Sequence, residues 1–145
     1  EKGMFENEVY PGIKQLLRVL TKQGILCLVA TSKPEIYAKK ILDYYELSSY
    51  FYYIAGANMD GTRTDKAEVI SYALKQIPAE YNNKKVLMVG DRSHDIIGAK
   101  KNGIDCAGVL FGYGSSEELE EAGADFVADS VEAVRNIILL DTAMN

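Results

Sequence analysis

Two aspartates, Asp91 and Asp95, stand directly after an apolar stretch of the chain. The stretch "KKVLMVG" over 84–90 predicts a strand, and "SHDIIGAKKNG" over 93–103 predicts a helix that Ser93 would cap. Asp91 would then end the strand and Asp95 would lie in the first helical turn, with both carboxylates facing one point. Such hard oxygen donors are preferred by Mg²⁺, which also keeps several waters. Alternatively, Asp91 makes a turn and Asp95 complements the helix dipole.

A pair of hydroxyls and a lysine suggest a place for an anion. Thr31 and Ser32 follow the apolar run "ILCLVA" and precede a predicted helix, where hydroxyls and free backbone N–H groups together bind phosphate. The alternative is that Ser32 only caps that helix. Lys66 opens another predicted helix, where a cation opposes the helix dipole unless an anion lies nearby. The alternative for Lys66 is a solvated lysine at a helix end.

Three other features resemble functional motifs less closely. The segment "NMDGT" over 58–62 has the composition of a turn, and we expect Asp60 to serve that turn. Tyr113 lies between two glycines, but the GxGxxG spacing of a dinucleotide loop is absent, so a flexible rim loop bordering the site is expected. His94 is the only histidine, and we expect it to be exposed at a helix start.

Helix-like and strand-like periodicities alternate along the chain, which is typical of α/β proteins. Strands are predicted over 25–32, 50–57, 84–90, 105–112 and 125–129, and helices over 11–24, 33–47, 65–77, 93–103, 115–123 and 130–140. Right-handed crossovers would join the strands into an open, doubly wound parallel sheet. Ligands bind at the carboxyl ends of the strands in such sheets. The candidate residues named above lie at those ends.

The composition limits the classes of partner. A net charge of −5 offers no broad cationic surface, which argues against nucleic acid and against a membrane. No apolar run is long enough to span a bilayer, and the first ten residues lack the pattern of a signal peptide, so a cytoplasmic location is expected. Cys27 and Cys106 lie in apolar stretches without metal-ligand spacing, and we expect both to be buried, reduced thiols.

Three segments occur in an order that resembles a known family. "TSKP" follows a strand, "TDKAEVI" opens a helix, and "VGDRSHDIIGAK" joins a strand to a helix. This order resembles the second, third and fourth motifs of the haloacid dehalogenase superfamily of phosphotransferases, closest to its phosphoglycolate phosphatase branch. The resemblance covers essentially the whole chain.

The resemblance implies a role for each matching residue. Thr31, with Ser32 beside it, would bind the transferring phosphoryl group, and Lys66 would neutralise its charge and that of the nucleophile. Asp91 would bind Mg²⁺, and Asp95 would support the metal directly or through water. This set suits phosphoryl transfer, which depends mainly on positioning and on charge stabilisation.

The resemblance also implies a missing part. The family's nucleophile is an aspartate in a DxDGT motif at the end of the first strand, and the chain has only "NMDGT", with Asn58 in the nucleophile's place. We therefore expect residues 1–8 to be the return segment from an absent cap, and residues 9–145 to be the core. The chain as given should not form an aspartyl-phosphate.

The family's sheet places the nucleophile strand between the strands predicted over 25–32 and 84–90. Its absence would leave a gap in the middle of the sheet and unpaired backbone groups. We expect the missing N-terminal segment or a second chain to complete the sheet, or the two strands to rearrange.

Two functional hypotheses follow. The first is the core of a Mg²⁺-dependent phosphomonoester phosphatase that acts on a small phosphorylated metabolite. The second is a non-catalytic α/β module, either a receiver-like signalling domain or a pseudoenzyme. In receiver domains the acidic pair precedes the lysine, whereas Lys66 precedes Asp91 here, and this order favours the phosphatase.

Overall fold

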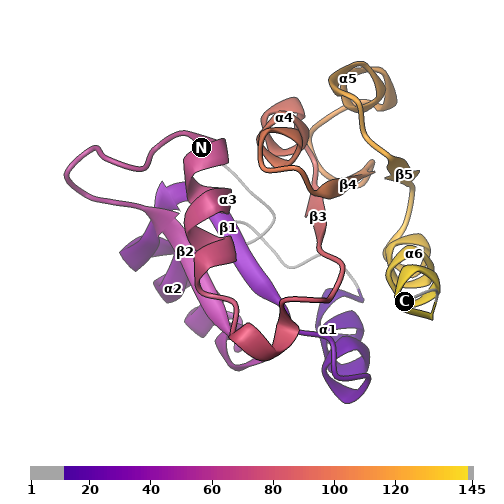
Figure 1. Ribbon diagram of the computed structural model, residues 1–145, viewed down its shortest axis with the longest axis horizontal. Coiled ribbons are helices and arrows are strands. Elements are labelled where there is room, and N and C mark those ends of the chain that lie inside the picture. The colour runs from indigo at the N-terminus through magenta and orange to yellow at the C-terminus, as the bar shows by residue number, and fades with distance from the viewer. Residues whose placement is uncertain (1–11, 144–145) are drawn as a thin grey trace. The chain divides into compact units, whose positions relative to one another are not determined.

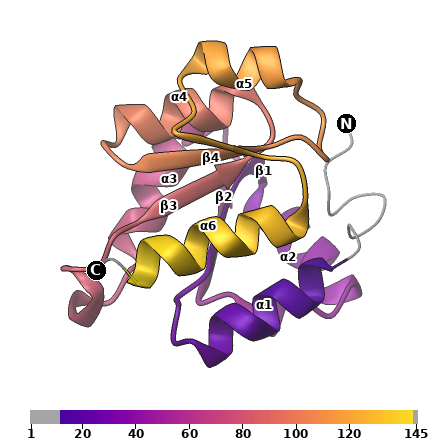
Figure 2. The ribbon, with the colours of Figure 1, turned by 90° about the vertical axis from the view of Figure 1, so that its right-hand side faces the viewer.

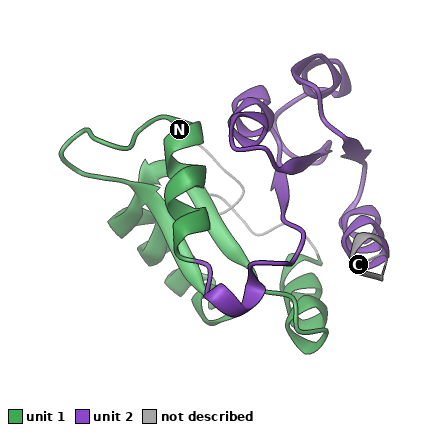
Figure 3. Cartoon of the chain, viewed as in Figure 1, with its two compact units in different colours: residues 1–76 green, residues 77–145 purple. Residues whose placement is uncertain are grey.

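The computed structural model describes residues 12–143, so the predicted return segment over 1–8 lies outside the described residues. The chain divides into two compact units, residues 1–76 and residues 77–145 (Figure 3). Each unit contains parallel strands with helices packed against them. The α/β class predicted from the sequence is therefore confirmed.

The first unit is built on two parallel strands. Its elements are α1 (Ile13–Lys22), β1 (Leu28–Pro34), α2 (Glu35–Tyr44), the short 3₁₀ helix η1 (Ser48–Tyr50), β2 (Tyr53–Ala57) and α3 (Lys66–Lys75). Both α2 and α3 pack against β1 and β2, and Figure 1 shows them on opposite faces of this pair of strands. The carboxyl ends of β1 and β2 therefore share one edge, from which the chain enters α2 and α3.

The helices of this unit bury the residues that their periodicity predicts. The amphipathic face of α1 buries Ile13, Leu16, Leu17 and Leu20. On α3, Val69 and Ala73 pack with Ala55 of β2 in one apolar cluster. Side chains three or four residues apart share a helix face, so the buried residues of each helix form a single stripe.

The second unit is built on three parallel strands. Its elements are the 3₁₀ helix η2 (Ala79–Tyr81), β3 (Leu87–Gly90), α4 (Ser93–Lys101), β4 (Asp105–Val109), α5 (Ser116–Ala122), β5 (Phe126–Ala128) and α6 (Val131–Ala143). Figure 2 shows α4 and α5 on one side of β3 and β4, and α6 on the other. The strand order is β3–β4–β5, and Gly90 of β3 is in register with Gly108 of β4.

The core of the second unit lies between β4 and the helices α4 and α5. Ile96, Ala99, Cys106 and Leu119 are each 0% exposed and form one cluster. Gly108 allows the close approach of α5, because a Cβ on this glycine would lie 2.9 Å from a methyl carbon of Leu119. The contact between the end of β4 and α5 therefore depends on a glycine.

The parallel strands form two separate ladders. β1 pairs with β2, and β3 pairs with β4, but within residues 12–143 no ladder joins β1 to β3. The family resemblance implies a nucleophile strand between β1 and β3. That a further segment fills this place stays a prediction.

Two smaller findings concern the composition. Both cysteines are free, with Cys106 buried and Cys27 partly exposed, and burial raises the pKa of each thiol. Among the described residues, no helix has the length and apolar character needed to cross a membrane.

We predict that Leu119→Ala destabilises the second unit by about 2–5 kcal/mol, because it removes buried methyl groups and leaves a cavity between α5 and β4. Urea denaturation followed by circular dichroism measures this change. The matched control is Leu140→Ala, since Leu140 is 66% exposed and should change the free energy of unfolding by no more than about 0.5 kcal/mol. Equal effects of the two substitutions would contradict the assignment of Leu119 to the core.

Candidate functional site

Thr31 and Ser32 lie in an irregular part of β1 near its carboxyl end. The pairing with β2 is regular to Ala30, and its register shifts before Pro34. Within this segment the Thr31 hydroxyl accepts a hydrogen bond of 3.2 Å from the N–H of Lys33. Irregular strand ends of this kind often re-aim side chains beside active sites. A hydroxyl whose oxygen accepts one bond can still donate its proton, so Thr31 is able to donate to a ligand oxygen.

The helix after this segment begins later than predicted. α2 starts at Glu35, and no side chain caps it. The alternative in which Ser32 only caps the helix is therefore wrong, because β1 continues through Ser32 to Pro34. Ser32 is also three residues away from the helical N–H groups, which leaves its hydroxyl and the local backbone as its means of binding an anion.

Lys66 is the first residue of α3, as predicted. The helix start is stabilised by a capping arrangement, in which Asp65 accepts from the N–H of Ala67 at 3.1 Å and Glu68 accepts from the N–H of Asp65 at 3.3 Å. Asp65 and Glu68 thus provide the negative charge that a helix N-terminus favours. Lys66 therefore lies at a helix end whose backbone is fixed by the capping bonds of Asp65 and Glu68.

Asp91 follows β3, and the loop after β4 encloses its side chain. One carboxylate oxygen, Oδ2, accepts a 2.9 Å hydrogen bond from the N–H of Tyr113. The glycines on either side of Tyr113 are needed here, because a Cβ on Gly112 would collide with the Asp91 side chain and one on Gly114 with its carbonyl oxygen. The loop after β4 therefore contacts Asp91 and orients the carboxylate of this candidate metal ligand.

Asp95 lies in the first turn of α4, as predicted, and is 4% exposed. Its Oδ2 accepts hydrogen bonds from the N–H groups of Asp91 at 3.0 Å and Arg92 at 3.2 Å. A Cβ on Gly90 would collide with this side chain, so glycine is required at the end of β3. Asp95 therefore fixes the backbone from which Asp91 projects.

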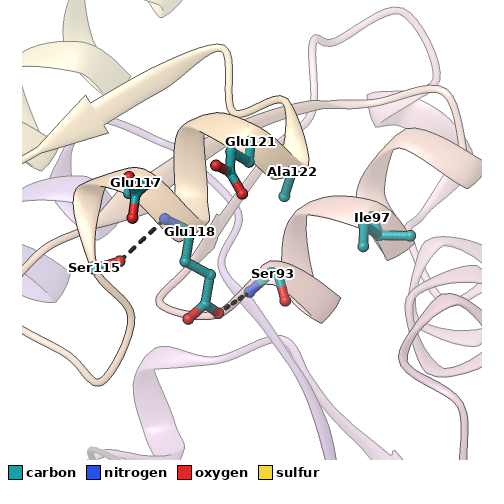
Figure 4. Close-up of a pocket in the computed structure, with 7 residues that line it drawn as sticks. All are labelled: Ser93, Ile97, Ser115, Glu117, Glu118, Glu121 and Ala122. Carbon is teal, nitrogen blue, oxygen red and sulfur yellow. Dashed lines mark hydrogen bonds between the residues drawn. The ribbon is translucent and has the colours of Figure 1, made fainter.

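Glu118 of α5 stabilises the start of α4, a role that the sequence did not reveal. Its Oε2 accepts from the Ser93 N–H at 2.7 Å (Figure 4). The same oxygen accepts a 3.0 Å hydrogen bond from Arg92 Nε. The prediction that Ser93 caps α4 is wrong, because α4 begins at Ser93 itself and the acceptor for its N–H comes from α5. Ser115 caps α5 and accepts from the Glu118 N–H at 3.0 Å.

A shallow hollow lies between α4 and α5 in the second unit. It is lined by Ser93, Ile97, Ser115, Glu117, Glu118, Glu121 and Ala122 (Figure 4). Three of these residues are glutamates, whose charge repels a phosphate. We therefore place no phosphate in this hollow, although it adjoins the start of α4.

The remaining predictions concern Asp60 and His94, which are not among the candidate site residues. Asp60 closes a turn, accepting bonds from the Thr62 N–H at 3.0 Å and the Thr62 hydroxyl at 2.7 Å, so the predicted turn is confirmed. These hydrogen bonds lower the pKa of Asp60. The His94 side chain is 57% exposed, with Nε2 at 3.8 Å from Asp95 Oδ1, so its predicted exposure is also confirmed.

The donor chemistry of the second unit suits a hard divalent cation. No three His, Cys, Asp or Glu side chains of the described residues are grouped to hold a metal ion. Mg²⁺ is commonly bound by one or two carboxylates, with waters and substrate phosphate completing its shell. Asp91 and Asp95 fit that requirement in type and number, whereas they do not form an all-protein cage.

The structure brings the candidates together within each unit. Thr31, Ser32 and Lys66 lie at the carboxyl edge of β1 and β2 in the first unit. Asp91 and Asp95 are joined through the backbone at the end of β3 in the second. The function of the five residues as one set stays a prediction.

We predict that Glu118 makes the stability of the second unit depend on pH. The Ser93 N–H, followed by the Arg92 side chain, lowers the pKa of Glu118 below its ordinary value of 4.5. Because the folded-state pKa is depressed, this stabilisation is present above pH 4.5 and disappears as the pH falls through the folded-state pKa. Thermal unfolding should therefore separate the wild type from Glu118→Gln at neutral pH, and the difference should shrink below pH 4.5. A difference independent of pH would contradict this assignment.

Comparison with known proteins identifies the family. The model of the haloacid dehalogenase-like hydrolases matches residues 2–109, which is more than half of the chain. A solved structure, described as a predicted phosphatase from Clostridium acetobutylicum, is 44% identical and superposes with a TM-score of 0.85, covering 94% of this chain and 62% of that one.

Curated relatives carry several names. A 5'-nucleotidase of Pseudomonas aeruginosa is 38% identical, over 94% of this chain and 61% of that protein. The tyrosine-protein kinase PtkA of Mycobacterium tuberculosis is 36% identical, over 94% of this chain and 47% of that protein. A phosphoglycolate phosphatase of Pseudomonas fluorescens is 32% identical, over 93% of this chain and 48% of that protein. The chain thus spans about half to three fifths of these relatives, and it belongs to the haloacid dehalogenase-like hydrolase family.

Proposed function

We propose that the chain is the core of a Mg²⁺-dependent phosphatase that hydrolyses small phosphate monoesters. The observation that carries this proposal is the arrangement around Asp91, whose carboxylate is oriented by the Tyr113 N–H and whose backbone is fixed by Asp95. A fixed carboxylate at the carboxyl end of a strand is what a metal-assisted phosphoryl transfer requires. Family membership supports the same reaction class.

The first unit would bind the phosphoryl group. Thr31 would donate its hydroxyl proton to a phosphoryl oxygen while its oxygen accepts from the Lys33 N–H, since a hydroxyl can do both at once. Ser32 would add a second donor. Lys66 would offset the negative charge that the phosphoryl oxygens and the nucleophile bring together. These are the positioning and charge-stabilising roles on which phosphoryl transfer depends.

The second unit would hold the metal. Asp91 would be a direct ligand of Mg²⁺, and Asp95 would support the ion directly or through water while holding the Asp91 backbone. Bound Mg²⁺ would neutralise charge on the phosphoryl oxygens and orient the group for in-line attack.

The nucleophile is the part that this chain does not supply. We infer that an aspartate outside the sequence given forms the new bond to phosphorus as the bond to the alcohol oxygen breaks, and that water then cleaves the aspartyl-phosphate to release phosphate. On this proposal the chain by itself is inactive. A missing segment or a second chain would complete the sheet beside β1 and β3, whose ladders include only β2 and β4, respectively, within the described residues.

The names of the relatives guide the choice of substrate. A nucleotidase and a phosphoglycolate phosphatase both act on small phosphate monoesters, which supports a small phosphorylated metabolite here. PtkA is named as a tyrosine kinase, so the acceptor of the phosphoryl group has to be measured and not assumed to be water. In the alternative function, a non-catalytic module, the phosphoryl group is transferred neither to water nor to another acceptor. A cytoplasmic location remains part of the proposal.

We predict that, in the full-length protein containing this chain, Asp91→Asn lowers kcat/KM for an aryl phosphate at least about 100-fold in the presence of Mg²⁺, because the substitution removes a charged metal ligand. Release of the aryl alcohol and of inorganic phosphate should be measured in the same samples. Alcohol released without an equal amount of phosphate would indicate transfer to another acceptor.

The matched control is Asp105→Asn. Asp105 begins β4 and pairs with Lys85 at 3.4 Å on the surface, at the opposite end of the strands from Asp91. It should leave kcat/KM within about twofold of the wild type, as expected for an exposed ion pair. Activity unaffected by Asp91→Asn would reject the site, and a wild type with no Mg²⁺-dependent activity would favour the non-catalytic module.

A further inference from the structure

Arg63 occupies an unusual backbone conformation in the first unit. It lies in the loop between β2 and α3, three residues before Lys66, with a φ of 53°. Only a few per cent of residues other than glycine adopt this left-handed region. Its side chain is nevertheless only 17% exposed, so the long cation is directed into the unit instead of into solvent.

Three contacts hold the Arg63 guanidinium. Its Nε donates to the carbonyl oxygen of Gly56, at 2.9 Å. Its Nη2 lies 3.6 Å from the carboxylate of Glu35. Its Cζ lies 3.7 Å from the centre of the Tyr72 ring, in a cation–π arrangement. The planar guanidinium can satisfy all three at once, whereas a lysine ammonium cannot.

Glu35 closes the same group from the other side. Its Oε1 accepts a 3.2 Å hydrogen bond from the N–H of Gly56. A Cβ on Gly56 would lie 2.7 Å from both the Glu35 Cα and the Lys33 carbonyl oxygen, so only glycine permits this approach. We call these four residues, Glu35, Gly56, Arg63 and Tyr72, the Arg63 clasp.

The clasp joins the segments that carry the phosphate-binding candidates. Glu35 directly follows the segment with Thr31 and Ser32, and Gly56 belongs to the end of β2. Tyr72 lies on α3, the helix that Lys66 begins, and its hydroxyl is 2.9 Å from that of Tyr53 on β2. The guanidinium is therefore the common contact of the β1–α2 corner, the end of β2 and α3.

The loop does not need Arg63 in order to close. Its tip is held by its own bonds, with Asn58 Nδ2 donating to the Thr62 hydroxyl at 2.7 Å and the Asn58 N–H donating to the Thr62 carbonyl at 3.2 Å. Asp60 adds two further bonds to Thr62. The contacts of Arg63 with Gly56 and Glu35 therefore fix the position of the loop relative to β2 and α2.

We propose that Arg63 is a positioning residue for phosphate binding, which holds Lys66 at a fixed place relative to Thr31 and Ser32. The charge of Lys66 lies at the end of a long side chain. The direction from which this charge reaches a phosphate therefore depends on where α3 starts. The clasp sets that start against the β1–α2 corner. The inference rests on the proposed function, because it requires Thr31 and Lys66 to bind the same phosphoryl group.

The test compares inorganic phosphate binding by the full chain and by Arg63→Lys, using NMR titration of the Thr31 and Lys66 backbone amides. Arg63→Lys keeps the net charge, so long-range attraction of the anion is unchanged. It loses the Nε bond to Gly56 and the stacked geometry on Tyr72. We expect phosphate to bind about 5- to 20-fold more weakly, while the thermal unfolding temperature changes by only a few degrees.

The matched control is Lys39→Ala, because Lys39 also pairs with Glu35, at 3.7 Å, but is 52% exposed and lies outside the clasp. It should leave the phosphate dissociation constant within about twofold of the wild type. A merely structural role for Arg63 would lower the unfolding temperature of Arg63→Lys without changing phosphate affinity, and that result would overturn the inference.

Lys66→Ala separates the two possible failures. If it weakens phosphate binding at least tenfold while Arg63→Lys binds like the wild type, the clasp has no positioning role and the proposed site stands. If Lys66→Ala has no effect, the proposed phosphate site is wrong, and the inference about Arg63 is overturned with it.

Discussion

In each unit a carboxylate in the first turn of a helix accepts backbone N–H groups from the end of a strand. Asp95 of α4 binds the N–H groups of Asp91 and Arg92, and Glu35 of α2 binds that of Gly56. An unsatisfied N–H at such a corner is costly, and a helix N-terminus favours a negative charge, so one side chain meets both needs. The residues proposed for chemistry depend on these corners for their positions.

Glycines allow the corners to be this tight. Gly90 makes room for Asp95, Gly112 and Gly114 for Asp91, and Gly56 for the backbone around Glu35. In each case a Cβ would overlap a carboxylate side chain or a neighbouring backbone atom, so the requirement comes from close approach and not from an unusual φ. At each corner the acidic residue and the neighbouring glycine therefore depend on each other, because the acidic residue fits only where the glycine has no side chain.

Local sequence patterns predicted the elements well because local interactions determine them. The buried stripe of α1 is set by residues three and four apart, and the start of α3 is set by Asp65 and Glu68 beside Lys66. The start of α2 was misplaced, because Ser32 resembles a cap while β1 continues to Pro34. The division into two sheets depends on strand pairing, which periodicity does not encode.

The contacts that orient the candidate site could not be predicted in the same way. Glu118 meets Ser93 across 25 positions of the chain, and Gly56 meets Glu35 across 21. Such pairs exist only after α5 packs on α4 or β2 pairs with β1. The acidic first turn of α5 was visible in the sequence, but nothing in it specified the partner. The candidate site residues could be named from the sequence because their order and strand-end positions are properties of the sequence.

The proposed function requires Thr31 and Lys66 to act on the same phosphoryl group as a metal ion that Asp91 would hold. Paramagnetic relaxation tests it most directly, with Mn²⁺ replacing Mg²⁺ and inorganic phosphate present in the full-length protein that contains this chain. We expect Mn²⁺ to broaden the amide resonances of Thr31 and Lys66, and Asp91→Asn to remove the broadening. Broadening confined to residues around Asp91 and Asp95, with Thr31 and Lys66 unaffected, would contradict it.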